Sequence, residues 1–379
     1  MSKSNETTPN VPTLRFAEYT DEWHKYALSD FVTRITRRNK NNESSLPLTI
    51  SAQYGLVDQI TFFNKTVASV DLSGYYLLYN GDFAYNKSYS NDYAWGAVKR
   101  LDKYEKGCLS SLYFVFRPTD KVDSDYLTHY FETSKWHKGI SDIAGEGARN
   151  HGLLNMAVDD YFATKHYLPS LSEQKKIACF LNLITKRIEI QNKIISDLKV
   201  LKKELCRKML SSIAEYKPLG ELCSITTGKL DANANNQNGL YPFFTCGKDT
   251  LSIDNYAFDG EAILIAGNGD IGHTKYYYGK FNAYQRTYVL MSFKADAQFV
   301  KMGIDTYLPQ KILEETQGGA MPYIKLSTLT SLKIPFTTEE KQFSIRNHYD
   351  TIAQKVENET KILNLLLQQK SYFLNAMFI

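Results

Sequence analysis

The sequence lacks the cysteine pattern of a disulfide-bonded or zinc-bound protein. Its 379 residues include five cysteines, an odd number, at Cys108, Cys179, Cys206, Cys223 and Cys246. None belongs to a Cys-x-x-Cys pair, and no group of His and Cys has the spacing of zinc ligands. We therefore expect reduced thiols and no bound metal, as in a cytoplasmic protein.

Long hydrophobic runs are also lacking. The first ten residues, MSKSNETTPN, are polar and contain no apolar signal core. Apolar runs such as residues 262–266 are much shorter than the roughly 20 residues that cross a bilayer. The sequence therefore predicts a cytoplasmic location and no membrane partner.

The common catalytic motifs are absent as well. The sequence contains no GxxxxGK[ST] phosphate-binding loop, no HExxH and no Asn-Pro-Pro-Tyr tetrapeptide of the kind with which adenine methyltransferases hold a flipped base. Glu173-x-Lys175 and Glu339-x-Lys341 resemble the end of a nuclease motif, but each lies in the first turn of an expected helix, where acidic residues favour the helix dipole. We therefore expect no catalytic residue and no cofactor bound by this chain.

One glycine pattern imitates a dinucleotide site. Residues 267–272 read Gly-Asn-Gly-Asp-Ile-Gly, which matches GxGxxG. A dinucleotide site needs a helix directly afterwards to hold the pyrophosphate, whereas the following HTKYYYGKF is aromatic and typical of a strand. The pattern therefore predicts a glycine-rich turn between two strands.

What the chain does contain is a repeated helix-start signal. LPSLSEQKK at 168–176 is echoed by IPFTTEEKQ at 334–342. In both segments a proline ends the preceding element, and Ser or Thr then precedes acidic residues. Ser170 with Glu173, and Thr337 with Glu340, have the spacing of a capping box. We expect a helix to begin in each segment.

A heptad pattern follows each start. Steps of four and three residues trace a coiled-coil seam in each segment. The first seam contains Ile177, Leu181, Ile184, Ile188, Ile195, Leu198, Leu205 and Met209. The second contains Ile345, Tyr349, Ile352, Val356, Leu363, Leu366, Phe373 and Met377. The polar exceptions fall at matching steps, Gln191 with Glu359 and Lys202 with Lys370, so we interpret the helices as duplicates.

The repeat divides the chain into four parts, a domain at 1–167, a helix at 168–213, a domain at 214–333 and a helix at 334–379. A domain of the size of 214–333 has a radius of gyration of roughly 14 Å, whereas each helix would be roughly 50 Å long. The second helix is therefore expected to begin near the end of the first and to run antiparallel to it. The fold class expected is α+β, with two β-rich mixed domains joined by a pair of long antiparallel coiled-coil helices in a pseudo-twofold internal repeat.

Shorter matches extend the repeat into the domains. Leu28–Phe31 is echoed by Leu219–Leu222, and SLYFVF at 111–116 by the buried-strand pattern VLMSF at 289–293. YNGDFAYN at 79–86 is similar to FDGEAILI at 258–265, which places Gly81 and Gly260 in equivalent turns.

Basic, amide and aromatic residues gather in the expected loops. In the first copy they occupy 85–100 and 145–152, and in the second they surround Lys248 and run from Asn268 to Arg286. Arg and Lys suit guanine edges and phosphates, whereas Asn suits adenine edges. Any one of these residues is explained more simply by a solvated loop. For clusters at equivalent places in two repeats, contact with a nucleic acid is as good an explanation.

Four runs of the sequence carry a family resemblance. They are VPTLRFAEYTDEWHKYALSDF at 11–31, GDFAYNKSYSNDYAWGAVKRL at 81–101, EGARNHGLLN at 146–155 and AMPYIKLSTLTSLKIPFTTEEK at 320–341. Together with the repeated helices, they resemble the specificity subunits of type I restriction–modification enzymes over essentially the whole chain.

The resemblance implies a DNA-binding role without catalysis. Each domain would be a target recognition domain that reads one half of a bipartite, asymmetric site in double-stranded DNA, and the helices would set the spacing between the halves. Two methyltransferase (modification) subunits would dock on the helices, bring S-adenosylmethionine and methylate one adenine in each half. Restriction/translocase subunits would bring ATP and Mg²⁺. The chain would then be the non-catalytic subunit of a type I site-specific deoxyribonuclease and adenine DNA methyltransferase complex.

Carried onto this sequence, the resemblance implies DNA contacts from both domains. The residues in the first domain are Tyr85, Asn86, Lys87, Ser88, Lys99, Arg100, Arg149, Asn150 and His151. Those in the second domain are Lys248, Asn268, His273, Lys275 and Arg286.

Two other functions stay open at this point. The first is a non-catalytic coiled-coil scaffold with two protein-binding domains. The second is an enzyme with a cryptic site, such as a stand-alone nuclease. The slope of DNA affinity against salt separates the first from a DNA reader, and cleavage of DNA by the purified chain with Mg²⁺ would reveal the second.

Overall fold

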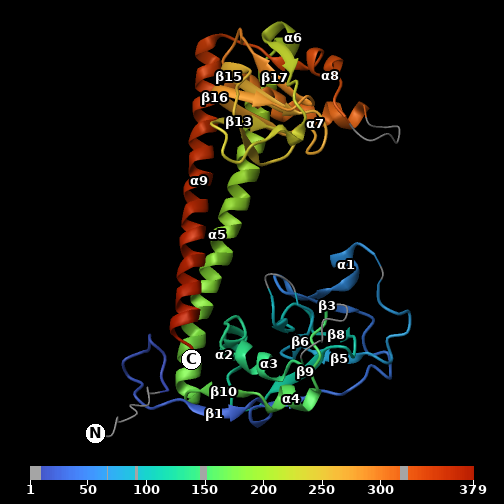
Figure 1. The fold of residues 1–379 in the computed structure, drawn as a ribbon, viewed down its shortest axis with the longest axis vertical. Coiled ribbons are helices and arrows are strands. Elements are labelled where there is room, and N and C mark those ends of the chain that lie inside the picture. The colour runs from blue at the N-terminus through green and yellow to red at the C-terminus, as the bar shows by residue number, and fades with distance from the viewer. Residues whose placement is uncertain (1–9, 66, 90–92, 146–151, 316–322) are drawn as a thin grey trace. The chain divides into compact units, whose positions relative to one another are not determined.

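The computed structural model describes residues 10–65, 67–89, 93–145, 152–315 and 323–379 (Figure 1). Its contacts divide the chain into two units. The first unit comprises Met1–Ile190 with Leu363–Ile379, and the second comprises Gln191–Ile362. Each unit contains one β-rich domain and part of each of two long helices.

A four-stranded antiparallel sheet lies at the centre of the first unit, in the order β2-β9-β6-β7. Its strands are β2 (Val32–Arg34), β9 (Phe114–Pro118), β6 (Phe83–Asn86) and β7 (Ala97–Arg100). Two ladders accompany it, β3 (Leu48–Ser51) with β4 (Gly55–Asp58) and β5 (Tyr76–Tyr79) with β8 (Lys106–Leu109). The short helices are α1 (Gln59–Phe63), α2 (Ser124–Tyr130), α3 (His137–Ile143) and α4 (Val158–Ala163).

Both faces of this sheet are buried. Because successive strand residues point to opposite faces, Phe83 and Tyr85 belong to a core that they share with residues of α2, α3 and α4, whereas Ala84 between them belongs to the core of the β3–β4 and β5–β8 ladders. The strand FAYN is therefore apolar on both sides, although its sequence contains a tyrosine and an asparagine.

The second unit contains a six-stranded sheet in the order β12-β17-β15-β16-β13-β14, in which only the β13–β16 pairing is parallel among the described strands. Its strands are β12 (Ser224–Thr227), β17 (Thr287–Met291), β15 (Phe258–Ala266), β16 (Thr274–Ala283), β13 (Tyr241–Phe244) and β14 (Thr250–Ile253). Three helices cover one face, α6 (Leu219–Leu222), α7 (Ala297–Glu315) and α8 (Leu326–Thr330).

The two domains share one frame. The order β2-β9-β6-β7 of the first sheet corresponds to β12-β17-β15-β16 of the second. The strands predicted to match across the repeat, around 111–116 with 289–293 and 79–86 with 258–265, therefore occupy the same places, and those predictions are confirmed. The prediction for the glycines is wrong. Gly81 lies in the turn before β6, but Gly260 lies inside β15, paired with Gly279.

A two-stranded ladder closes each domain next to its helix. β1 (His24–Ala27) pairs antiparallel with β10 (Lys165–Leu168), and β11 (Tyr216–Pro218) pairs antiparallel with β18 (Lys333–Pro335). Leu28 and Leu219, which follow the first strand of each ladder, donate backbone hydrogen bonds to Thr164 and Leu332 at 2.9 and 2.8 Å. The first and last strands of each domain are thus held together, and the chain leaves each domain beside the place where it began.

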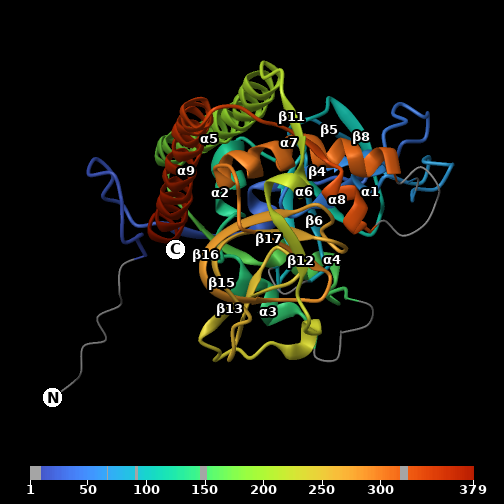
Figure 2. The same cartoon turned by 90° about the horizontal axis from the view of Figure 1, so that it is seen from above.

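The long helices are α5 (Leu171–Ser211), with 41 residues, and α9 (Glu339–Ala376), with 38 residues. Figures 1 and 2 show them side by side. In the second unit the Gln191 side chain hydrogen-bonds Glu359 at 2.6 Å, and Lys202 lies over the ring of Tyr349. Since residue numbers rise along one helix as they fall along the other, the pair is antiparallel there. In the first unit the rings of Phe180 and Phe373 meet edge to face.

The seam residues named from the sequence are all buried or half-buried, and all except Met377, which directly follows α9, lie in these helices. Their polar exceptions have partners. Gln191 and Glu359 bond each other, Lys202 lies over Tyr349, and Lys370 forms an ion pair with Glu132 at 2.9 Å.

The helix starts differ from the predicted capping boxes. Ser170 Oγ accepts from the Glu173 amide at 3.4 Å, but the Glu173 carboxylate binds Arg15 at 2.7 Å instead of returning to Ser170. In the second copy the prediction for Thr337 is wrong, because α9 begins at Glu339 and Thr338 is the residue before it. A helix capped by Thr337 would begin at residue 338, one residue before the observed start.

No helix in the described part of the chain is both long and apolar enough to cross a membrane.

Candidate nucleic-acid interface

Three loops of the second unit meet at one end of its sheet. They contain residues 246–249, 267–273 and 284–286. The Gly267 amide donates to the Arg286 carbonyl at 3.0 Å, and the Asp270 amide donates to the Cys246 carbonyl at 3.1 Å. The Cys246 thiol also donates to the Arg286 carbonyl, at 3.2 Å. Backbone contacts therefore bring together loops that are about 40 residues apart in the sequence.

The glycine-rich pattern is the turn between β15 and β16, as predicted. Gly269 and Gly272 have positive φ angles of 63° and 75°. At Gly267 an added Cβ would lie 2.5 Å from the Arg286 carbonyl oxygen. The glycines therefore allow the loop to turn and to approach its neighbour closely, without a helix that could hold a dinucleotide.

The candidate side chains on these loops point to solvent to different degrees. Lys248, His273 and Arg286 are exposed, and Asn268 is half-buried. Lys275 is more constrained, because its Nζ donates to the Asp249 carbonyl at 3.2 Å and to Thr250 Oγ1 at 3.3 Å, and burial lowers its pKa. The structure thus gathers the predicted set of the second domain on converging loops, with Lys275 at its base.

The first domain places its candidates less uniformly. Asn86 is the last residue of β6, and Lys87 and Ser88 follow it. The Lys87 carbonyl accepts from the Leu154 amide at 2.9 Å, and Tyr89 donates to the Gly152 carbonyl at 3.0 Å. Lys87 Nζ lies 4.8 Å from the centre of the Phe114 ring, and burial lowers its pKa. Arg149, Asn150 and His151 lie outside the described residues, in a segment whose C-terminal flank contacts this loop.

Tyr85 is not a surface residue. Its side chain is 0% exposed, its ring stacks on Tyr161 at 4.7 Å, and its hydroxyl donates to the Trp95 carbonyl at 2.9 Å. A side chain without exposed surface cannot contact DNA, so the prediction for Tyr85 is wrong. Strand alternation turns this position toward the core.

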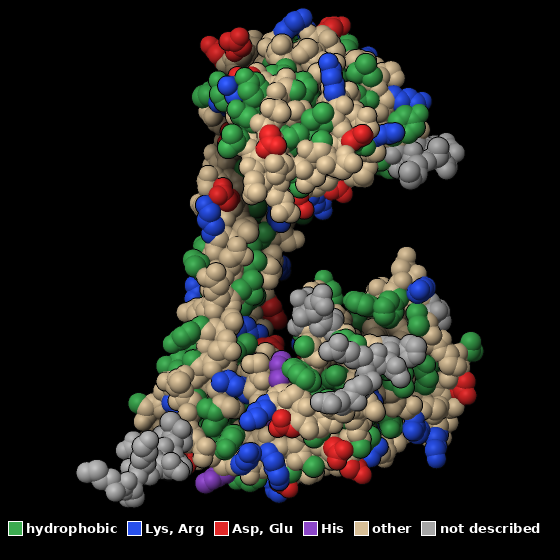
Figure 3. Space-filling view, in the orientation of Figure 1, with side chains coloured by type: hydrophobic (Ala, Val, Ile, Leu, Met, Phe, Trp, Pro, Cys, Tyr) green, Lys and Arg blue, Asp and Glu red, His purple; other side chains and the backbone are tan. Residues whose placement is uncertain are grey.

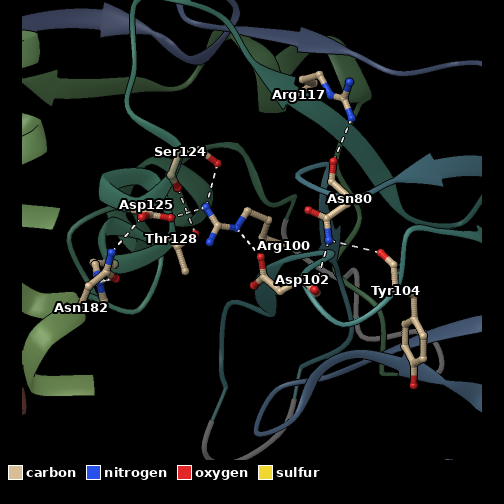
Figure 4. A network of polar contacts seen from close by, with 10 residues as sticks. Asn80, Arg100, Asp102, Tyr104, Arg117, Ser124, Asp125, Thr128 and Asn182 are labelled. Atoms are coloured by element: carbon tan, nitrogen blue, oxygen red, sulfur yellow. Dashed lines mark hydrogen bonds and ion pairs between the residues drawn. The ribbon is translucent and has the colours of Figure 1, made fainter. Parts of the chain in front are cut away.

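Arg100 is occupied by its own domain (Figure 4). Its guanidinium donates to Asp102 Oδ1 and to Asp125 Oδ1, both at 2.6 Å, and to Ser124 Oγ at 2.9 Å. Asp125 in turn accepts from the Asn182 amide at 2.8 Å. Arg100 therefore links β7 to α2, and through Asp125 to α5, so its role is to position these elements.

The sequence predicted only part of a pocket in the first unit that is lined by both polar and apolar residues. This pocket lies against β7, the segment between α2 and α3, and the last turns of α9, and its volume is about 650 Å³. Lys99 was a candidate from the sequence, but Glu132, His137 and Lys370, which line the same pocket, were not proposed as site residues. No local pattern could have joined positions so far apart in the sequence.

Within the described ranges, no three His, Cys, Asp or Glu residues come together as metal ligands.

On the face drawn in Figure 3, Lys and Arg side chains of both units are interspersed with Asp and Glu.

Comparison with known proteins links part of the chain to a family. Residues 213–368 match the family described as the type I restriction modification DNA specificity domain. The EcoDI specificity subunit of the type I restriction enzyme of Escherichia coli is 38% identical over 159 residues, which are 42% of this chain and 35% of that protein. The MjaVIII specificity subunit of Methanocaldococcus jannaschii is 24% identical over 330 residues, or 72% of this chain and 76% of its own length. The chain thus spans about a third of the length of the first relative.

Solved structures share the fold. The S subunit of a type I restriction–modification system from M. genitalium has a TM-score of 0.56 and 17% identity, and the alignment covers 97% of this chain and 99% of that one. A chain from a study of complex assembly in the type I system has a TM-score of 0.60 and 17% identity over 93% and 96% of the two chains. Both likenesses concern the architecture.

Proposed function

We propose that the chain is a specificity subunit of a type I restriction–modification complex and that it reads double-stranded DNA for that complex. The match of residues 213–368 to the type I restriction modification DNA specificity domain supports this proposal. Each domain would recognise one half of a bipartite, asymmetric target, and α5 with α9 would set the spacing between the halves. The chain would supply no catalytic residue of its own. Its expected place of action is the cytoplasm, where bacterial and archaeal DNA lies.

The observation that carries this proposal is a common frame with unlike loops. The four-strand order and the closing ladder are the same in both domains, whereas the loops beyond them differ in length and sequence. In the second domain, exposed Lys248, His273 and Arg286 stand on loops that backbone bonds hold together. Rigid support under variable basic loops suits base reading, because phosphates position a protein and base edges specify the sequence.

A salt titration tests DNA reading directly. Purified chain is mixed with a 40-base-pair duplex at several KCl concentrations. A DNA reader loses affinity steeply, with a slope of log K against log salt of about −0.9 for each phosphate contact. A protein-binding scaffold would show no such slope. The same chain with Mg²⁺ and no partner should leave the DNA uncut, and cleavage would indicate an enzyme instead.

The partner subunits belong to the proposal as well. We propose that two methyltransferase subunits dock on the helices, carry S-adenosylmethionine and methylate an adenine in each half-site, and that restriction subunits carry ATP and Mg²⁺. A second apolar stripe supports docking on the part of the helices in the first unit. Leu183 and Ile190 are 63% and 51% exposed on α5, and Leu365 and Tyr372 are 65% and 61% exposed on α9. Both pairs have heptad spacing and lie outside the seam.

Replacing this stripe tests the docking proposal. Leu183→Glu with Ile190→Glu should abolish co-purification with the methyltransferase subunit, because two carboxylates would be buried at the interface. The variant should keep the DNA affinity of the wild-type chain, because the stripe lies on the helices and not on the recognition loops. Lys193→Glu on exposed α5 surface is the control. Co-purification of the double variant at the wild-type level would contradict docking here.

A further inference from the structure

The pocket of the first unit has an unusual balance of charge. Lys370 Nζ and Glu132 Oε2 form an ion pair of 2.9 Å. Lys99 lies close enough to both for each to influence its charge, yet its ammonium has no hydrogen-bond or ion-pair partner among the described residues. Two ammonium groups thus share one carboxylate.

The burial of the Lys99 ammonium makes this imbalance of charge costly. Burial lowers the pKa of Lys99, the nearby Glu132 opposes that change, and Lys370 adds to it. A partly buried ammonium without a partner is costly, and a bound anion would remove that cost. Two histidine rings lie close to these groups. His129 Nδ1 lies 3.5 Å from Glu132 Oε2, and His137 lines the pocket, where burial lowers its pKa and favours the neutral ring.

Three polar side chains of the lining suit the oxygen atoms of a phosphate. Ser371 and Asn375 come from α9, and Gln53 comes from the turn between β3 and β4. Hydroxyl and amide groups of this kind donate to non-bridging oxygens, and lysine binds phosphate as a point charge. A volume of about 650 Å³ exceeds the needs of a free phosphate and leaves room for an attached sugar.

We propose that this pocket binds a backbone phosphate of the DNA, with Lys99 and Lys370 as its cationic contacts and Glu132 as the carboxylate with which the phosphate competes for Lys370. The proposal rests on the DNA-reading function proposed above and deepens it. The pocket lies on β7, the strand that ends the 85–100 segment, so it would position the duplex against the first domain. A phosphate contact carries no sequence information, so its loss should weaken target and non-target DNA alike.

Lys99→Gln is the first test. In the full chain, this variant should lower the magnitude of the salt slope by about 1 and weaken binding about five- to tenfold near 100 mM KCl, equally for two duplexes of different sequence. The matched control is Lys165→Gln, which removes the same charge from an exposed position on β10. A slope no different from that of the control would overturn the proposal. Lys99→Arg should restore the slope, and failure to do so in a folded variant would also overturn it.

Glu132→Gln should change the DNA affinity in the opposite direction from Lys99→Gln. Removing the carboxylate frees Lys370 and removes repulsion of the phosphate, so DNA should bind about two- to fivefold more tightly. Weaker binding by a variant with an unchanged melting temperature would contradict a phosphate site, because it would assign Glu132 a contact of its own.

Two further outcomes separate the sources of failure. If 20 mM inorganic phosphate raises the melting temperature of the wild-type chain but not of Lys99→Gln, while the slopes agree, the pocket binds free phosphate and the proposal is overturned. If the wild-type chain itself binds DNA without salt dependence, the DNA-reading function fails first. A steep wild-type slope with an unchanged Lys99→Gln slope removes only this pocket.

Discussion

At the scale of single residues, the hydrogen bonds of the buried His166 ring indicate which of its two nitrogens carries the proton. Its Nε2 lies 2.8 Å from Thr164 Oγ1, and its Nδ1 lies 2.7 Å from the Tyr130 hydroxyl. The Thr164 hydroxyl donates its hydrogen to the Tyr161 carbonyl at 2.7 Å, so its oxygen must accept from His166. The proton therefore sits on Nε2, Nδ1 accepts from Tyr130, and the ring is neutral.

This arrangement predicts a pH dependence of stability. Burial lowers the pKa of His166 to about 4, from an ordinary value of 6.5. Between these values the unfolded chain binds a proton that the folded chain refuses, so stability is complete above about pH 6.5 and falls as the pH drops toward 4. Thermal unfolding of the wild-type chain between pH 4 and 7 should show this fall.

His166→Gln should flatten this part of the profile, although it lowers stability at pH 7. His24→Gln, at an exposed position on β1, should leave the profile unchanged. If His166→Gln and the wild-type chain lose stability in parallel between pH 6.5 and 4, another group is responsible.

One substitution at Arg286 can show whether its side chain contacts a base or a phosphate of the DNA. Its side chain is exposed on the loops of the second domain, while its carbonyl is held by Gly267 and Cys246. Arg286→Ala should cost about 1–3 kcal/mol of binding at the target if the guanidinium reads a base, with little effect on other sequences. Binding is measured with target and base-substituted duplexes, and Lys333→Ala in the closing ladder is the control. An equal loss on all duplexes would make Arg286 a phosphate contact.

At the scale of elements, each long helix is fastened to its domain by a buried glutamine. Gln174 accepts from the Asp123 amide at 2.8 Å and donates to the Pro169 carbonyl at 3.0 Å. Gln342 accepts from the Asp296 amide at 3.0 Å and donates to the Thr337 carbonyl at 2.7 Å. Both aspartates also accept from an amide in the first turn of the helix that follows, α2 or α7. We call this arrangement the glutamine latch.

The latch predicts a local loss of stability in one unit at a time. Gln342→Leu leaves the Asp296 amide and the Thr337 carbonyl, both partly buried, without their partner, which costs about 1–3 kcal/mol. Hydrogen exchange should accelerate at the start of α7, while the start of α2 stays protected. Gln354→Leu, at an exposed position on α9, is the control. Equal acceleration in both variants would mean that the latch contributes nothing beyond helix propensity.

The same elements show what a sequence can and cannot predict. The seams are local and periodic, so their spacing alone located both helices. The start of α9 was misplaced, because the segment between Pro335 and α9 is two residues longer than the segment between Pro169 and α5. Tyr85 was misjudged because polarity says nothing about which face of a strand a residue occupies. The loops of the second domain converge through backbone bonds between distant residues, and no pattern in the sequence encodes those bonds.

At the scale of the whole molecule, duplication separates what is shared from what varies. The frame, the closing ladders, the latch and the seams recur in both copies, and the loops do not. The shared parts attach each domain to the pair of long helices. Varied parts are those that two different DNA half-sites would require. This division explains why matches across the repeat identified the corresponding strands and helices, whereas the residues expected to contact DNA stay a prediction.

The last prediction concerns the spacing between half-sites. α5 is continuous from the first unit into the second, and Gln191 bonds Glu359 in the seam. Deleting residues 194–200 and 351–357 removes one heptad from each helix and keeps that bond and the remaining register. The helices should shorten by about 10 Å, or about three base pairs of DNA. Methylome sequencing of a host that makes the variant with its methyltransferase should show a spacer shorter by that amount. Deleting 194–200 alone mismatches the seams and should abolish methylation. Methylation with an unchanged spacer after the paired deletion would show that the helices do not set the distance.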